Sequence, residues 1–311
     1  MTALAPAAVT APPIGRPGVI LVKRAWRQTR TKIGLALVAL LVSVALFGPF
    51  FAPHPPAAFA AIPFAHPSSA VPLGADNLGR DVAALLLYGG RSSLQIGISS
   101  AVICCAIATV VALFAGFFGG LVDSVLSRIM DIIWAFPVYL LAISISTELL
   151  THSSGFQVGP VHVSPTSLWL PTVIIAFIFL PYVYRPVRGQ VLSVVHREFV
   201  EAAIAQGASN LRLIFSEILP NVVSTVVVFL PLMIATTILT ESALSFLGIG
   251  VQPPNVSWGT IIQDGTDLVY TRPWVTIAPG LMILLTVLSL NVLGDGVRDA
   301  LDPRAKLRVE G

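Results

Sequence analysis

Charged side chains are scarce in this chain of 311 residues: Asp, Glu, Lys and Arg make up 11% of it, whereas soluble domains carry about 25%. Hydrophobic residues make up 55%, and the mean hydropathy is +0.87. So few charges cannot cover a surface that faces water, which excludes a soluble globular protein. The sequence therefore predicts an integral membrane protein.

Lysine is rarer still, since the chain contains only Lys23, Lys32 and Lys306. A phosphate-binding P-loop ends in Gly-Lys, and none of these lysines follows a glycine. The chain also lacks the His-Glu-x-x-His pair of zinc proteases and the Gly-x-Ser-x-Gly turn of serine hydrolases. These absences argue against an enzyme and against ATP binding through a P-loop.

Cysteine and histidine give no sign of a metal or redox centre. The two cysteines, Cys104 and Cys105, are adjacent within an apolar run, where they cannot form a relaxed disulfide with each other. Four histidines fall in segments expected outside the membrane, without the spacing typical of metal ligands. Surface histidines are thus favoured over a metal site at His54, His66, His152 and His162.

Six apolar stretches approach the length of about 20 residues that a helix needs to cross a hydrocarbon core of about 30 Å. Lipid offers the backbone no hydrogen-bond partners, so each span is predicted to be helical. The predicted fold class is therefore an all-α membrane protein with six transmembrane helices. The stretches are 33–51, 94–118, 132–147, 168–184, 221–240 and 273–294.

The distribution of Lys and Arg predicts the orientation. With the amino terminus inside, only Arg80, Arg91 and Arg272 of the eighteen basic residues lie outside, and positive residues favour the cytoplasmic side. Both termini are then cytoplasmic, and the net charge of +3 fits lipid headgroups better than nucleic acid. The predicted parts are a cytoplasmic tail (1–32), a first transmembrane helix (33–52), an extracytoplasmic loop (53–93), a five-helix core (94–297) and a cytoplasmic tail (298–311).

One charged segment interrupts the apolar core. It reads REFVEAAIAQGASNLRLIFSEILPN and covers residues 197–221, on the side predicted to be cytoplasmic. Its halves are expected to form two short amphipathic helices with a reversal at Gly207, because glycine readily adopts a positive φ. Such a segment, held in water between two spans, indicates a docking function.

This segment resembles the EAA loop of ABC importer permeases, through Glu-Ala-Ala, a glycine four residues after the second alanine, and Leu-Pro twelve residues after that glycine. Four further motifs resemble the dipeptide, oligopeptide and nickel importer permeases: LGADNLGRD, GGRSSLQIG, ESALSFLGIGVQPPNVSWG and NVLGDGVRDALDPR. Glu217 departs from the family, which commonly has His there. The resemblance implies a type I ABC importer permease fold in a bacterial inner membrane, with ATPase-coupling residues Glu201, Ala202, Ala203, Gly207, Leu219 and Pro220.

The resemblance also implies partners: a second homologous permease, two ATP-binding cassette subunits and an extracytoplasmic substrate-binding protein. ATP and Mg would bind to the ATPase subunits, and no cofactor is expected in this chain. Import of short peptides is the favoured function. Import of nickel or another small ligand is the alternative within the family, and a membrane receptor or scaffold is the alternative outside it.

Other residues allow two interpretations. Asp76, Arg80 and Asp81 are candidates for contact with the binding protein or the channel mouth, or for pairing within their own loop. Asp131, Glu241 and Asp295 lie near the ends of predicted spans, where a carboxylate can reach water, so structural roles are favoured. A short surface helix is expected around 257–268. A stripe of small residues in the second span indicates close helix packing, at Ala108, Ala112, Gly116 and Gly120.

Overall fold

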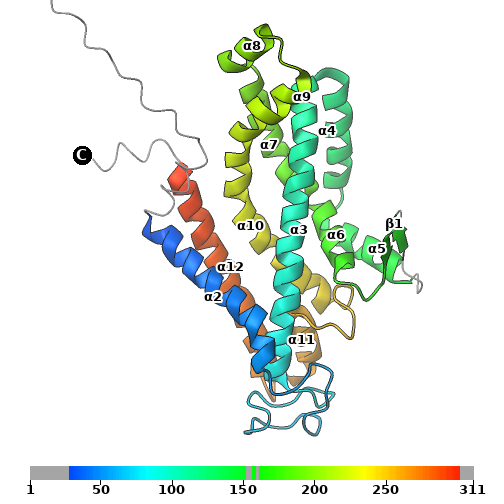
Figure 1. The fold of residues 1–311 in the computed structure, drawn as a ribbon. Helices are drawn as coiled ribbons and strands as arrows, with labels where there is room; N and C mark the ends of the chain where they lie inside the picture. Colours follow the sequence, from blue (N-terminus) through cyan, green and yellow to red (C-terminus); the bar gives the residue numbers. More distant parts are fainter. Residues whose placement is uncertain (1–27, 152–155, 159–160, 302–311) are drawn as a thin grey trace, which may run out of the picture.

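The computed structural model describes residues 28–151, 156–158 and 161–301, so most of both predicted tails lies outside the described residues. The described chain is helical, as predicted, except for one antiparallel hairpin of β1 (Phe156–Val158) and β2 (Val161–Val163). The longest helices run roughly along one long axis, whereas α5 lies across it (Figure 1). They are α2 (Thr29–Phe51), α3 (Val82–Phe118), α4 (Gly120–Ala135), α5 (Val138–Thr151), α6 (Trp169–Ile178), α7 (Leu180–Val195), α8 (Glu198–Ala205), α9 (Asn210–Arg212), a π-helix (Leu213–Ile218), α10 (Leu219–Phe246), α11 (Trp258–Asp264), a 3₁₀ turn (Thr266–Leu268) and α12 (Trp274–Leu301).

Four helices are long and apolar enough to cross a membrane by themselves: α2, α3, the helix ending in α10, and α12. Two bent pairs bring the number to six if each pair is one span: α4 with α5, bent by 89°, and α6 with α7, bent by 47°. The span predicted at 132–147 lies across the break at Phe136 and Pro137, so its residues do not form one continuous helix. Pro137 has no N–H to bond to the carbonyl of Ile133, which ends α4 there.

Helix α3 is the central element and begins earlier than the predicted span at 94–118. The carboxylate of Asp81 accepts a hydrogen bond from the N–H of Ala83 and caps the helix at Val82. Its other end lies at Gly119, whose φ is +61°. Because the chain turns at Gly119, Gly120 belongs to α4, so the predicted stripe of small residues ends at Gly116.

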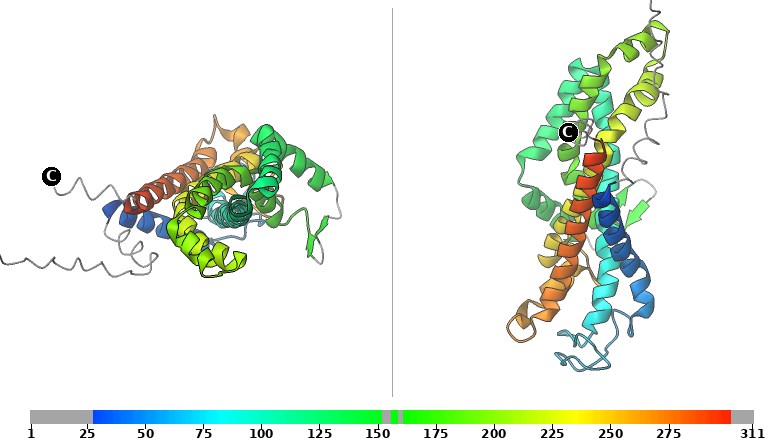
Figure 2. Two further views of the ribbon diagram at one scale, coloured as in Figure 1. Left: turned by 90° about the horizontal axis from the view of Figure 1, so that it is seen from above. Right: turned by 90° about the vertical axis from the view of Figure 1, so that its left-hand side faces the viewer.

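Small residues let neighbouring helices approach α3 and α12 closely. A Cβ on Gly116 would lie 2.5 Å from the side chain of Val191 on α7. A Cβ on Gly34 of α2 would lie 2.6 Å from the backbone of α12 at Leu293. Figure 2 shows α2 and α12 side by side along the bundle. The glycine on α2 thus lies against the backbone of α12, and the glycine on α3 accommodates a side chain of α7; close approach at small residues is typical of membrane helices.

The helix expected at 257–268 corresponds to α11 and the 3₁₀ turn, but it is not a surface helix. Its first residue, Trp258, is fully buried, and the indole N–H donates to the carbonyl of Leu86 on α3. Ser257 and Thr260 form a capping box at its start. Helix α11 is thus part of the packed core at the end of the molecule that also carries the loop before α3 (Figure 1).

Candidate coupling surface and charged sites

The segment at 197–221 forms the end of the molecule opposite α11 (Figure 1). Two carboxylates, Glu198 and Glu201, lie in the first turn of α8, where the positive end of the helix dipole stabilises their negative charge. The fully buried Val200 anchors α8 to the main core, and the π-helix does the same through Leu213 and Ile214. The segment is therefore fixed to the bundle on one face and open on the other.

The predicted reversal at Gly207 is confirmed. Its φ is +77°, a conformation that costs a residue with a Cβ about 1–2 kcal/mol. The N–H of Gly207 donates to the carbonyl of Ile204 at 2.9 Å, and the N–H of Ala208 donates to that of Ala203 at 3.1 Å. These two bonds make a Schellman motif, which ends α8 and turns the chain toward α9.

The other residues carried over from the EAA motif lie around this turn. Glu201 and Ala202 are exposed, whereas Ala203 is half-buried and packs against the main core. The two alanines therefore do not share one open face, because α8 turns only Ala202 outward. Leu219 and Pro220 begin α10 directly after the π-helix, and Pro220 has no N–H to donate to that preceding turn.

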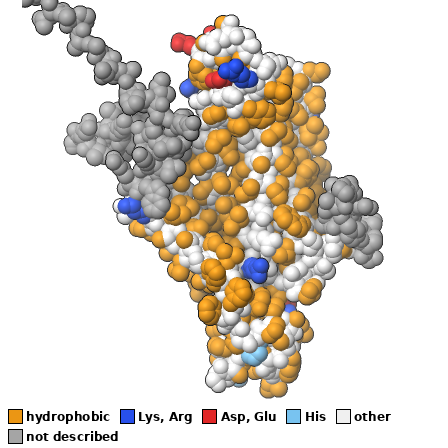
Figure 3. All heavy atoms as spheres, viewed as in Figure 1, with side chains coloured by type: hydrophobic (Ala, Val, Ile, Leu, Met, Phe, Trp, Pro, Cys, Tyr) orange, Lys and Arg blue, Asp and Glu red, His pale blue; other side chains and the backbone are white. Residues whose placement is uncertain are grey.

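Large exposed hydrophobic side chains surround the turn, and the sequence reading did not single them out. Their exposed fractions range from 38% to 62%, although they lie beside charged residues. Figure 3 shows acidic and basic side chains gathered over this end of the molecule. An exposed apolar patch with a polar rim is typical of a protein interaction surface. We call this set the coupling patch: Phe199, Ile204, Leu211 and Phe215.

At the opposite end, Asp76, Arg80 and Asp81 bond within the chain. Asp76 is buried and accepts hydrogen bonds from the N–H groups of Leu78 and Arg80 and from the Arg80 guanidinium, the last at 2.6 Å. Arg80 also donates to Asp264 of α11 at 2.7 Å. These bonds join the loop to itself and to α11, and the prediction of a contact with the binding protein stays open.

Glu241 does not reach water, contrary to the expectation for a residue near a span end. It lies inside α10 and is fully buried. The hydroxyl of Ser245 donates to its carboxyl at 2.7 Å and that of Ser242 at 3.4 Å, and Ser93 and Ser257 also interact with it. The carboxyl group of Glu241 therefore interacts with serine hydroxyls from α3, α10 and the start of α11.

Three of these serines also hold backbone N–H groups near α11. Ser245 accepts from the N–H of Val251 at 3.0 Å, Ser93 from that of Trp258 at 3.1 Å, and Ser257 from that of Thr260 at 3.3 Å. Each hydroxyl can accept from the backbone and donate to Glu241 at the same time. We call these residues the Glu241 hub, which joins α11 and the chain before it to α3 and α10.

Two ion pairs that the sequence did not predict join α4 to α7. Arg188 donates to both carboxylate oxygens of Asp123. Farther along, Arg185 donates to Asp131 at 3.0 Å, and both side chains remain about half exposed, at 46% and 53%. Arg185 also lies 4.4 Å from the ring centre of Trp134. Together these contacts fix the α4–α7 packing beside the break at Pro137.

Histidine has one notable contact in the described chain, between Nδ1 of His54 and the carboxylate of Asp81 at 3.4 Å. Among the described residues, no group of three His, Cys, Asp or Glu side chains is arranged to hold a metal ion. His152 lies outside the described residues.

Long apolar helices together with helix pairs that are sharply bent at a break are typical of membrane transport proteins. Residues 108–307 match the family of binding-protein-dependent transport system inner membrane components, and residues 21–69 match the N-terminal transmembrane domain of oligopeptide transport permease C. The chain belongs to this family of transport permeases. It is accordingly a multi-pass protein of the bacterial inner membrane.

Named relatives cover most of the chain. A di/tripeptide transport system permease from Pseudomonas aeruginosa is 39% identical over 280 residues, which is 88% of each chain. A dipeptide transport system permease from Alkalihalophilus pseudofirmus is 37% identical over 88% of this chain and 86% of that protein. The fold is similar to a chain of an inward-facing methionine ABC transporter, with a TM-score of 0.56 at 18% identity, over 70% of this chain and 97% of that one.

Proposed function

We propose that this chain is the permease subunit of an ATP-driven importer of short peptides. The observation that carries this proposal is the family membership, together with relatives of 37% and 39% identity that are named for dipeptide and di/tripeptide transport.

The coupling patch and the turn at Gly207 form the surface to which an ATPase subunit docks. Glu201, Ala202 and Gly207 present the turn, Ala203 holds α8 against the core, and Leu219 and Pro220 join the segment to α10. Because the π-helix continues directly into α10, a displacement of the segment is transmitted along that helix. ATP hydrolysis on the partner then moves the bundle between inward-facing and outward-facing states.

The remaining partners follow from this assignment. The importer comprises a second, homologous permease, two ATP-binding cassette subunits that bind ATP and Mg, and an extracytoplasmic binding protein. In this arrangement the chain has six spans, with the bent pairs as the third and fourth and with both termini in the cytoplasm. The loop at 53–81 and α11 then face the binding protein.

Reconstituted transport tests the proposal. The complete importer is placed in proteoliposomes with its binding protein, and uptake of labelled di- and tripeptides is measured together with ATP hydrolysis. We expect saturable peptide uptake that requires ATP, with peptide-stimulated hydrolysis. Nickel uptake that peptides do not inhibit would replace the peptide assignment by the metal one, and an assembly without substrate-stimulated hydrolysis would favour a receptor or scaffold.

A further inference from the structure

We infer that the break between α4 and α5 forms a binding site for peptide cargo on the translocation path, with Arg185 and Asp131 recognising the charged ends of the peptide. This inference rests on the proposed function and adds a location and a recognition chemistry to it. Three independent features of the structure meet here: an open cavity, an exposed ion pair and an interrupted helix.

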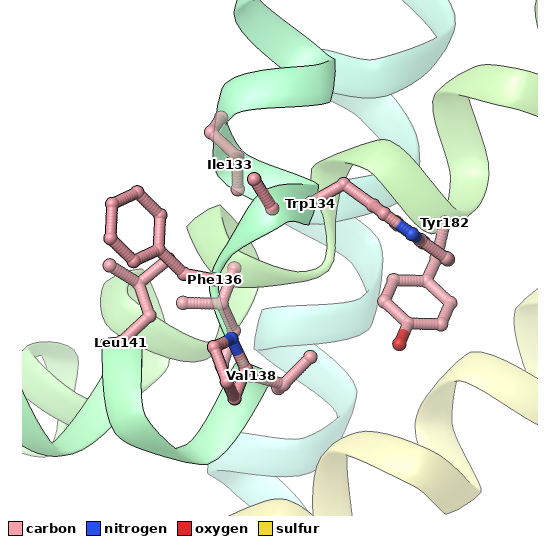
Figure 4. Close-up of a pocket in the computed structure, with 9 residues that line it drawn as sticks. Ile133, Trp134, Phe136, Val138, Leu141 and Tyr182 are labelled. Carbon is pink, nitrogen blue, oxygen red and sulfur yellow. The ribbon is translucent and has the colours of Figure 1, made fainter.

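The cavity has a volume of about 360 Å³, which falls within the range of sites for small molecules, about 300–1,000 Å³. Figure 4 shows Trp134 and Tyr182 together on one side and Phe136, Val138 and Leu141 around the break. The two aromatic rings are 4.1 Å apart between centres. Aromatic and aliphatic walls of this kind accept side chains of different shapes, as a carrier of mixed peptides requires.

The ion pair is next to one wall of this cavity, since Arg185 lies over the ring of Trp134, which lines it. Arg185 and Asp131 each belong to a bent helix pair that qualifies as a span, yet each side chain is about half exposed. Charged groups inside spans face water-filled cavities or other protein rather than lipid. The cavity and its ion pair therefore face water or another protein subunit rather than lipid.

The contact between Arg185 and Asp131 leaves room for a ligand. A single hydrogen bond joins them, from the guanidinium to Oδ1 of Asp131. Arginine has five N–H donors and a carboxylate has two oxygens, so both groups keep free positions. A free peptide carries an ammonium group at one end and a carboxylate at the other. Its carboxylate fits the guanidinium, and its ammonium group fits the second oxygen of Asp131.

The interrupted helix supplies the third feature. Pro137 cannot donate to the carbonyl of Ile133, and Ile133 lines the cavity. Non-helical backbone at membrane depth is tolerated where it lines a water-filled cavity or is buried in protein. A carbonyl turned toward this cavity can accept a hydrogen bond from a peptide N–H group.

The test compares peptides with free and blocked ends in the reconstituted importer. Arg185→Gln should slow uptake of a tripeptide about tenfold, the effect of losing one hydrogen bond to a charged group, but slow its C-amidated form less than about twofold. Asp131→Asn should show the same contrast between the free tripeptide and its N-acetylated form. The same binding protein delivers each peptide to the wild type and to every variant. Any preference of the binding protein for free or blocked peptides therefore cancels when the variant rate is divided by the wild-type rate for the same peptide.

Two further variants make the test specific. Arg128→Gln removes an exposed guanidinium from the same face region of α4, away from Trp134, and should affect free and amidated peptides equally. Arg185→Lys keeps the positive charge and should recover part of the lost rate. Membrane abundance, copurification of the partner subunits and ATP hydrolysis are measured for every variant.

Equal losses for free and blocked peptides in Arg185→Gln and Asp131→Asn would overturn the inference, as would loss of the partner permease from those variants, which would make the pair a subunit contact. Both results are compatible with peptide import by the wild-type importer. Absence of peptide uptake by the wild-type importer would instead refute the proposed function.

Discussion

Removal of the Glu241 carboxyl group should loosen α11 from the bundle. In Glu241→Ala, the hydroxyls of Ser242 and Ser245 lose their acceptor inside the core, and those of Ser93 and Ser257 lose an interaction partner. A buried polar group without a partner costs about 1–3 kcal/mol. Partial relaxation of four small side chains reduces the sum, so we expect a destabilisation of about 3–5 kcal/mol, similar to breaking a buried charged pair.

The loss should appear first in the backbone groups that the serines hold. Hydrogen exchange measured by mass spectrometry reports on the amides of Val251, Trp258 and Thr260, which donate to hub serines. Every 1.4 kcal/mol is a factor of ten, so exchange in the peptide containing these amides should accelerate at least about a hundredfold. Exchange around α8, at the other end of the bundle, should remain unchanged.

Ser289→Ala is a matched control for this experiment. Ser289 is also a buried hydroxyl in a span, but it bonds only to the carbonyl of Leu285 within α12. Its removal should cost about 1 kcal/mol or less and leave exchange near α11 unaltered. Unchanged exchange at 251–260 in Glu241→Ala would refute the reasoning, because it would show that the hub does not hold α11.

Three further predictions concern backbone geometry and orientation. Gly207→Ala should lower peptide uptake and coupled ATP hydrolysis together at normal membrane abundance, because a residue with a Cβ at a φ of +77° costs about 1–2 kcal/mol of backbone strain. Gly189→Ala is the control: a Cβ there also has no atom within 4 Å, but Gly189 has no positive φ, so we expect no effect. Gly34→Ala should reduce thermal stability by about 1–3 kcal/mol, because the Cβ would lie 2.6 Å from the backbone of α12, and an unchanged melting temperature would contradict this contact. In a cysteine-free background, Ser209→Cys should react with a membrane-impermeant reagent only from the cytoplasm and Tyr270→Cys, at a residue 98% exposed, only from outside; reaction of both from one side would reverse the proposed topology.

The helices and the turn at Gly207 were predictable from the sequence because each depends on local chemistry. Apolar stretches must form helices where the backbone has no other partner, and a glycine between two short amphipathic segments permits the positive φ that a Schellman turn requires. Helix α3 shows where this reasoning stops. The apolar residues 82–88 are separated from the predicted span by Gly-Gly-Arg-Ser-Ser at 89–93, so hydropathy gave no reason to join them to the helix starting at 94.

The surroundings of Glu241 could not be predicted, because they depend on contacts distant in the sequence. Ser93 lies on α3 and Ser257 at the start of α11, and neither position shows that its hydroxyl turns toward α10. The sequence did contain one sign that Glu241 has hydrogen-bond partners: Ser242 and Ser245 follow it one and four residues later on the same helix. A carboxyl group with hydroxyls on its own helix can be buried with its partners, which hydropathy averaging does not register.

The two breaks in the spans were hidden for a related reason, and this connects them to transport. Hydropathy averaged over about 20 residues treats Pro137 and Pro181 as small losses within apolar stretches, although each removes the backbone donor that would continue a helix. Bilayer lipid cannot satisfy the backbone exposed at such a break, so the break must face protein or water. The exposed pair of Arg185 and Asp131 lies beside one of these breaks and requires the same surroundings. The helix breaks and the charged pair, which a search for uniform apolar helices passes over, thus share the surroundings that the proposed peptide site requires. Their positions depend on contacts in the folded chain, so the apolar stretches could be read from the sequence while the breaks required the structure.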